Sequence, residues 1–404
     1  MTTAHSPRRE ILLGALLPAF IFSLGAGAMI PVLAPFAVER GASLAVAGII
    51  AAMLPVGQIL ADLPAGALAA RVGDRRAMLI AAGAAAIGFL AAGLAPSLLT
   101  LGAAVGLVGA ANAVFHLARH SYLTEVTPVH QRARVLSTLG GVHRIGQFLG
   151  PFLGAGVLLL GDLRAVFLLA LLTALAAGVT VLLAPEIDTR PARAPGASRA
   201  GFTQVIARHR ELLLTLGVAS MLVGAIRGAR QQVLPLWGEH IGLDPTTISL
   251  LFGLAGGIDM LLFYPAGKIM DRFGRLWIGV PSMTCLGVAM ALVPLAHSVP
   301  VLAAVAVLLG VSNGLGSGVM MTIASDIAPA DARPQFLGAW RLMQDFGIAA
   351  GPLTLAAGAA LGSLAAGVWV AAAMGPLASA GLLRWLPRYS VHASSRTRRA
   401  AGID

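Results

Sequence analysis

Three aspartates lie inside long apolar segments of the sequence, where little water would solvate a charged side chain. They are Asp62, Asp259 and Asp345. A carboxylate at such a depth is costly unless it faces protein or water, so it usually serves a function such as taking up and releasing a proton. We predict that Asp345 is the proton carrier, with Arg341 one helical turn away as its alternating partner, followed by Asp259 and Asp62 as candidates.

Depth within the segments matches two of these acids with arginines. Arg144 and Asp259 each lie about 15 Å from one end of their segments, counting roughly 1.5 Å per residue, and Asp62 and Arg341 lie about 9 to 11 Å deep. We expect two interhelix pairs, Arg144 with Asp259 and Asp62 with Arg341. These are either static ion pairs that hold the helices together or switches that open when the carboxylate is protonated.

Other polar side chains inside the segments are candidates to line a substrate cavity. These are Asn112, His116, His143, Arg144, Gln147, Arg227, Arg230, Gln231, Asn313 and Gln344. For His116, a structural role and contact with substrate or proton both stay open. Arginine outnumbers aspartate within the segments, which disfavours a dedicated lipophilic-cation site and suits neutral, zwitterionic or anionic amphiphiles.

The elements that position these residues must be membrane-spanning helices. The chain has 404 residues, of which 57% are hydrophobic and only 11% charged, far too apolar for an ordinary soluble domain. A helix needs about 20 apolar residues to cross a bilayer. The sequence predicts an all-α membrane protein with twelve transmembrane helices near residues 11–37, 44–69, 77–95, 98–118, 134–160, 163–184, 211–236, 246–269, 277–296, 299–323, 335–360 and 363–386.

The distribution of basic residues predicts the orientation. The formal net charge is +11. Most basic residues lie at the N-terminus, at the C-terminus and in the alternate loops that share their side of the membrane. Arg40 and Arg164 lie in loops on the opposite side. The positive-inside rule then places both termini in the cytoplasm, in the cell (plasma) membrane. The basic loops favour anionic membrane lipids. The sequence has no stretch in which aromatic and basic residues alternate as in single-strand nucleic-acid sites, so we expect no nucleic-acid partner.

An internal repeat divides the chain into two halves. Residues Pro64–Arg76 and Pro265–Arg275 share Pro, Ala, Gly, Arg and Gly in register, and each residue of the second copy lies 201 positions after its counterpart. The same offset links Asn112 with Asn313 and Gly146 with Gly347. We therefore expect two pseudo-symmetric six-helix bundles, residues 1–184 and 211–404. A cytoplasmic linker, 185–210, would join them, and the basic tail after Arg388 is expected to be disordered.

The repeated loop resembles the signature of the major facilitator superfamily, G-x-x-x-D-R/K-x-G-R-R/K. In the second copy Gly267, Asp271, Arg272, Gly274 and Arg275 occupy its positions. The first copy keeps Gly66, Arg71 and Gly73 but has Ala70 in place of the acid and Asp74 in place of an arginine. The resemblance implies a conformational latch, which we expect to be less sensitive in the first half, so that substituting Asp74 does little.

A second motif resembles the fifth helix of the superfamily's proton-coupled antiporters. It contains Gly146, Gly150, Pro151 and Gly154. The motif indicates either export or close helix packing through small residues. In this family helices five and eight, and helices two and eleven, line the interface between the halves, so the resemblance implies that both expected ion pairs bridge it.

Taken together, these patterns favour a proton-coupled secondary transporter that exports small amphipathic molecules by alternating access, similar to the twelve-helix drug and metabolite efflux antiporters. Two alternatives stay open: a proton symporter or facilitator that imports an organic anion or metabolite, and a non-transporting membrane receptor or scaffold. No nucleophile, nucleotide or metal-ligand motif indicates an enzyme, a cofactor or a metal. The expected partners are a small-molecule substrate, protons and membrane lipids, and the expected state is a monomer. Cys285 stands alone, and we expect it to be small, buried and unbridged.

Overall fold

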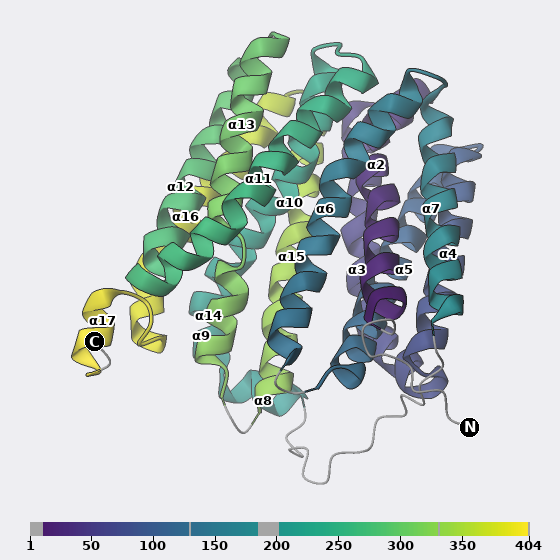
Figure 1. Cartoon of the computed structure of the whole chain (residues 1–404). Coiled ribbons are helices and arrows are strands. Elements are labelled where there is room, and N and C mark those ends of the chain that lie inside the picture. The colour runs from purple at the N-terminus through teal and green to yellow at the C-terminus, as the bar shows by residue number, and fades with distance from the viewer. Residues whose placement is uncertain (1–10, 129–130, 185–201, 330–331, 403–404) are drawn as a thin grey trace, which may run out of the picture. The chain divides into compact units, whose positions relative to one another are not determined.

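The computed structural model describes residues 11–128, 131–184, 202–329 and 332–402, and these form helices joined by short turns, with no strand among them (Figure 1). Clustering of contacts divides the chain into two compact units. The first comprises residues 1–194 with 242–253, and the second comprises residues 195–241 with 254–404. The expected linker lies mostly in residues 185–201, outside the described residues, so its bounds stay a prediction.

Six long helices build the first unit. A π-helical turn, Leu12–Leu16, leads into α2. The long helices are α2 (Leu17–Glu39), α3 (Leu44–Val72), α4 (Asp74–Gly93), α5 (Leu98–Val126), α6 (Arg132–Leu158) and α7 (Leu163–Leu183).

The second unit repeats this series with additional short helices. It begins with α8 (Phe202–Arg208), α9 (Arg210–Leu212) and a π-helical turn, Leu213–Gly217. The helices that follow are α10 (Val218–His240), α11 (Pro245–Phe273), whose first turns group with the first unit, α12 (Leu276–Leu292), α13 (Val299–Gly316), α14 (Val319–Ile327), α15 (Arg333–Ala360), α16 (Leu364–Tyr389) and α17 (Ser395–Ala400).

Helix pairing repeats between the units, as the sequence offset predicts. In the first unit α2 packs on α6 and α7, and α4 packs on α5 and α7. In the second unit α10 packs on α15 and α16, and α12 packs on α13 and α16. The helix starts repeat as well: the Ser43 and Asp244 side chains accept hydrogen bonds from the backbone N–H groups of Val46 and Thr247, at 3.4 and 2.9 Å. Such caps satisfy N–H groups that the first helical turn leaves unpaired.

Ten helices or helix pairs among the described residues are long and apolar enough to cross a membrane. The protein is therefore a multi-pass membrane protein. Two further long helices, α6 and α15, correspond to the expected fifth and eleventh spans. They carry charged and amide side chains near their middle, including Arg144 and Asp345, which lowers their mean hydropathy.

Small residues let two helix pairs approach closely. A Cβ atom added at Gly146 would lie 2.7 Å from the Phe20 carbonyl oxygen, and one at Gly150 would lie 2.5 Å from that of Leu24. Both carbonyls belong to α2. Gly347 and Gly351 meet α10 in the same way, so the fifth-helix motif and its repeat serve packing.

Two local expectations were wrong. Cys285 is exposed on α12 rather than buried, because it lies on the face that membrane lipid would cover. The tail is ordered as far as Gly402 and includes α17, whose Ser394 and Thr397 form a capping box. Ser and Thr are strong helix-capping residues, which the composition of the tail alone did not reveal.

Candidate functional site

The buried carboxylate of Asp259 is the centre of a polar cluster in the second unit. Asp259 is 8% exposed. It accepts hydrogen bonds from the Asn313 amide at 2.5 Å and the Ser317 hydroxyl at 3.2 Å, and it pairs with the Arg230 guanidinium at 3.4 Å. Three donors therefore compensate the cost of removing this carboxylate from water.

A break between α13 and α14 supplies part of this cluster. Helix α13 ends at Gly316, and Gly318 adopts a left-handed φ of 83° before α14 begins. The Gly316 carbonyl, which the break frees from the helical ladder, accepts a hydrogen bond of 2.5 Å from Arg227 of α10. Broken helices with exposed backbone groups are typical of substrate and ion sites in transporters. One continuous span over residues 299–323 was predicted from the sequence, and Ser317 was not among the predicted site residues, although Gly316 and Gly318 on either side of it indicate a break.

The expected pair of Arg341 and Asp345 forms in α15. The Arg341 Nε atom lies 3.5 Å from an Asp345 carboxylate oxygen, and their side chains are 58% and 20% exposed. Both residues belong to one helix and lie one turn apart. The ion pair can therefore break when the exposed Arg341 side chain rotates.

Three histidines gather in the first unit. The Ser23 hydroxyl lies 2.5 Å from Nδ1 of His143. The His116 ring stacks on His120 with 4.6 Å between centroids, and it meets the edge of His143 at 5.9 Å. These side chains come from α2, α5 and α6. Neutral imidazoles both donate and accept hydrogen bonds, so the cluster offers a polar face for substrate or proton.

Arg119 lies beside these histidines and was not among the predicted site residues. It is 2% exposed, and its guanidinium carbon lies 5.9 Å from the centre of the Phe115 ring. Its Nε atom is buried and makes no hydrogen bond to any described residue. A buried cation of this kind gives the first unit a positive interior. Its position towards the C-terminal end of α5 made it look like a loop residue in the sequence.

The signature loop of the second unit is held from two sides. Arg275 pairs with Asp271 at 3.2 Å and with Asp326 of α14 at 2.9 Å. The tail holds the other side: the Arg398 guanidinium donates to the backbone carbonyls of Asp271 and Arg272, at 2.9 and 2.5 Å. Gly274 has a φ of 100° and lies against the tail backbone, which explains why the loop requires glycine there.

The equivalent loop of the first unit differs in charge. Gly73 adopts a φ of 84°, as Gly274 does in the repeat. Asp74, which corresponds to Arg275, is 3% exposed, and it forms a hydrogen bond with Ser121 and faces the charge of Glu125. A buried, hydrogen-bonded carboxylate is costly to remove. The structure therefore argues against the expectation that substituting Asp74 does little.

The remaining predicted site residues differ in burial and in what surrounds them within each unit. Asp62, Asn112, Arg144, Gln147, Gln231 and Gln344 are half-buried. A Cβ atom at Gly66 or Gly267 would meet nothing within 4 Å, so these two motif glycines are not required for packing. The bridges of Arg144 with Asp259 and of Asp62 with Arg341 stay predictions, although Asp259 and Arg341 already have partners in their own unit.

Two repeated units of long apolar helices, with charged side chains buried inside them, define a membrane transporter rather than an enzyme. A family model described as Major Facilitator Superfamily matches residues 15–352. The chain therefore belongs to the major facilitator superfamily. A comparison with curated proteins found no match.

Solved structures of transporters share this fold at low sequence identity. A POT family transporter in complex with 5-aminolevulinic acid is 13% identical with a TM-score of 0.77, covering 96% of this chain and 98% of its own. A human organic anion transporter is 17% identical (TM-score 0.67; 93% and 99% covered). A D-xylose-proton symporter is 18% identical (TM-score 0.67; 95% and 97% covered). These likenesses establish the fold alone.

Proposed function

We propose that this protein is a proton-coupled secondary transporter that exports small amphipathic molecules by alternating access. Twelve spans, cytoplasmic termini, a place in the plasma membrane and a monomeric state belong to the same proposal. The observation that carries it is the ion pair of Asp345 with Arg341, at 3.5 Å inside the long helix α15. A carboxylate that exchanges a proton for an arginine partner makes a conformational equilibrium depend on pH.

Asp345 is a better proton carrier than Asp259 on geometric grounds. The partners of Asp259 come from α10, α13 and the residue that follows α13, so protonation would disturb contacts between several segments. One partner of Asp345, Arg341, lies on the same helix and is 58% exposed. This ion pair can break and re-form when the exposed Arg341 side chain rotates.

Positive charge supports the substrate class. Arg119 is buried beside the histidines of the first unit, and Arg227 and Arg230 reach the Asp259 cluster of the second. Neutral, zwitterionic or anionic amphiphiles fit such interiors better than lipophilic cations do. The resemblance of α6 to the fifth helix of antiporters supports export, although its glycines also serve packing. The signature loop around Asp271 would act as the latch between conformations.

The experiment is transport into everted membrane vesicles that contain the full chain, with an imposed pH gradient and a panel of labelled organic anions, zwitterions and cations. An exporter accumulates substrate in the lumen when the lumen is acidic. We expect accumulation of members of the first two classes and not of the third. Accumulation that requires an alkaline lumen would contradict export.

Import of an organic anion is the second candidate, and Arg119 suits its anionic substrate as it suits an anionic substrate of an exporter. A buried guanidinium with no carboxylate among its described contacts is suited to an anionic ligand. In the same vesicles a proton symporter would accumulate its substrate only when the lumen is alkaline, because substrate and protons then enter together. The sign of the required pH gradient therefore separates the two candidates.

A further inference from the structure

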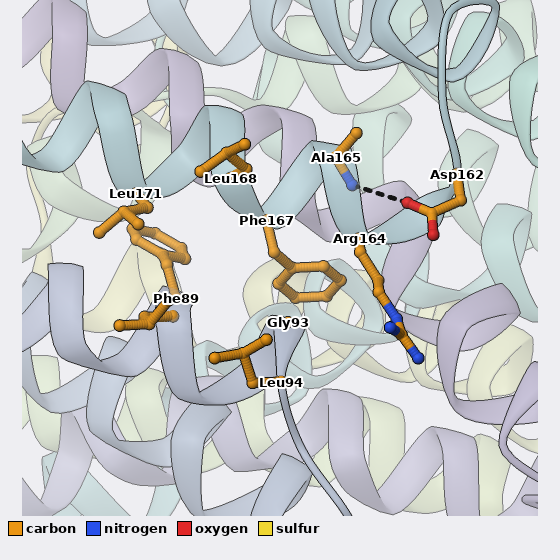
Figure 2. A pocket seen from close by; sticks show the side chains of 10 residues that line it. Phe89, Gly93, Leu94, Asp162, Arg164, Ala165, Phe167, Leu168 and Leu171 are labelled. Atoms are coloured by element: carbon orange, nitrogen blue, oxygen red, sulfur yellow. Dashed lines mark hydrogen bonds between the residues drawn. The ribbon is translucent and has the colours of Figure 1, made fainter.

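A pocket opens on the first unit between the end of α4 and the start of α7. Its volume is about 320 Å³. Phe89, Leu94, Phe167, Leu168 and other apolar side chains line it (Figure 2). Leu94 and Leu168 are 68% and 54% exposed, so the pocket faces the surface that membrane lipid covers.

Charged groups occur at one side of this pocket only. Figure 2 shows Asp162 and Arg164 on one side and Phe89 and Leu171 on the other. Leu171 lies seven residues after Arg164, about 10 Å further along α7 at the helical rise. The pocket therefore has a polar end where α7 begins and an apolar end deeper along the helices.

Arg40 adds a second cation at the polar end. Its guanidinium lies 3.5 Å from the centre of the Phe36 ring and donates to the carbonyl of Gly93, which lines the pocket. Burial, and then the nearby charge of Arg164, lower the pKa of Arg40. Two cations that disfavour each other in this way would be stabilised by an anion between them.

Two carboxylates balance these arginines. One Asp162 oxygen accepts a hydrogen bond of 3.2 Å from the Ala165 N–H (Figure 2). The charges of both Glu39 and Asp162 act on Arg40. The polar end thus combines two cations with two anions, which complements a zwitterionic ligand better than an anionic one.

The equivalent positions of the second unit carry different side chains. Ile241 and Ala365 stand 201 positions after Arg40 and Arg164, and Trp369 stands 201 positions after Leu168. The Trp369 ring N–H donates to the Ala291 carbonyl of α12 at 3.2 Å, so an indole bridges the two helices that correspond to α4 and α7. The two arginines at the polar end of the pocket and Leu168 therefore have no like residues at the equivalent positions of the second unit.

The geometry points to a binding site for a phosphatidylethanolamine lipid, with an acyl chain between α4 and α7, the phosphate on Arg164 and the ammonium group on Asp162. A guanidinium matches phosphate oxygens in a bidentate manner. An ethanolamine head has N–H donors for a carboxylate, whereas a choline head has none. The inference requires only that the chain spans a membrane, and it is independent of the transported substrate.

The test is native mass spectrometry of the delipidated full chain, titrated with phosphatidylethanolamine, phosphatidylglycerol or phosphatidylcholine of the same acyl composition. We expect one tightly held phosphatidylethanolamine, and about tenfold weaker binding in Arg164→Gln, as for the loss of a hydrogen bond to a charged group. Leu168→Trp should have a similar effect, because it introduces the side chain that the second unit already accommodates.

Matched controls distinguish this site from the general lipid shell. Leu175→Trp changes a leucine of the same helix that is 48% exposed and lies outside the pocket, and Arg384→Gln removes a cation from α16. Both should bind lipid as the wild type does. The inference is overturned if Arg164→Gln and Leu168→Trp also bind like the wild type, or if all three lipids bind equally.

Discussion

At the scale of single residues, Asp345 and Asp259 differ in how firmly they are held. Arg341, whose side chain is 58% exposed, lies 3.5 Å from Asp345 one turn further on in α15, whereas Asp259 has partners on other segments at 2.5 to 3.4 Å. A side chain that gains and loses a proton in each cycle must change partners each time. We therefore propose Asp345 as the coupling residue and Asp259 as a residue that organises the cluster around it.

The variant Asp345→Asn should no longer accumulate substrate against a concentration gradient, but it should still exchange substrate between the two sides of the membrane. With one proton exchanged, a gradient of one pH unit supports about tenfold accumulation, or about 1.4 kcal/mol. We expect this ratio to fall to about one in Asp345→Asn and to return in part in Asp345→Glu, as measured by uptake and by counterflow in vesicles. Uphill transport by Asp345→Asn with the pH dependence of the wild type would transfer the role to Asp62 or Asp259.

At the scale of elements, the contact of α6 with α2 depends on glycines at defined positions. A Cβ atom at Gly150 would lie 2.5 Å from the Leu24 carbonyl oxygen, whereas one at Gly154 would lie 3.4 Å from the nearest Ala28 atom, an ordinary contact. Gly150→Ala should therefore destabilise the protein by about 1 to 3 kcal/mol, the usual cost of overpacking. Gly154→Ala, the matched control, should be neutral, because alanine also favours a helix. Thermal unfolding in detergent measures both; equal melting temperatures would show that α6 and α2 can separate without cost.

The contact of α17 with the signature loop is a second element that can be tested alone. The backbone N–H groups of Arg275 and Leu276 donate to the carbonyls of His392 and Ala393, at 3.2 and 2.9 Å. Arg398→Ala removes two further hydrogen bonds that hold the tail on the loop, so these N–H groups should exchange with solvent about tenfold faster.

Hydrogen exchange measured by mass spectrometry would show this change in peptides that contain Arg275 and Leu276. Arg399→Ala is the matched control, because Arg399 is the next residue of α17 and its side chain forms no hydrogen bond or ion pair with the described residues of the loop. Unchanged exchange in Arg398→Ala would mean that the tail rests on the loop without stabilising it.

At the scale of the whole molecule, features that depend on regular spacing along the chain were predictable from the sequence. The 201-residue offset predicted the repeated helix pairings, and Arg341 and Asp345 pair because they are one turn apart. The partners of Asp259 were not predictable, because Arg230 reaches it from α10 and Ser317 from the break between α13 and α14, and packing sets both positions. The burial of Asp74 and Arg119 was missed for a related reason: a charge near the end of an apolar segment looks like a loop residue until neighbouring helices cover it.

The central claim is that substrate moves outward in exchange for protons moving inward, and the pH of the vesicle lumen tests it most directly. In everted vesicles with an acidic lumen, adding a transported substrate should raise the lumenal pH, because an antiporter carries protons out as substrate enters. In Asp345→Asn the lumenal pH should stay constant when substrate is added, and the membrane should leak protons no faster than with the wild type. A transported substrate that leaves the lumenal pH unchanged, or lowers it, would contradict proton-coupled export.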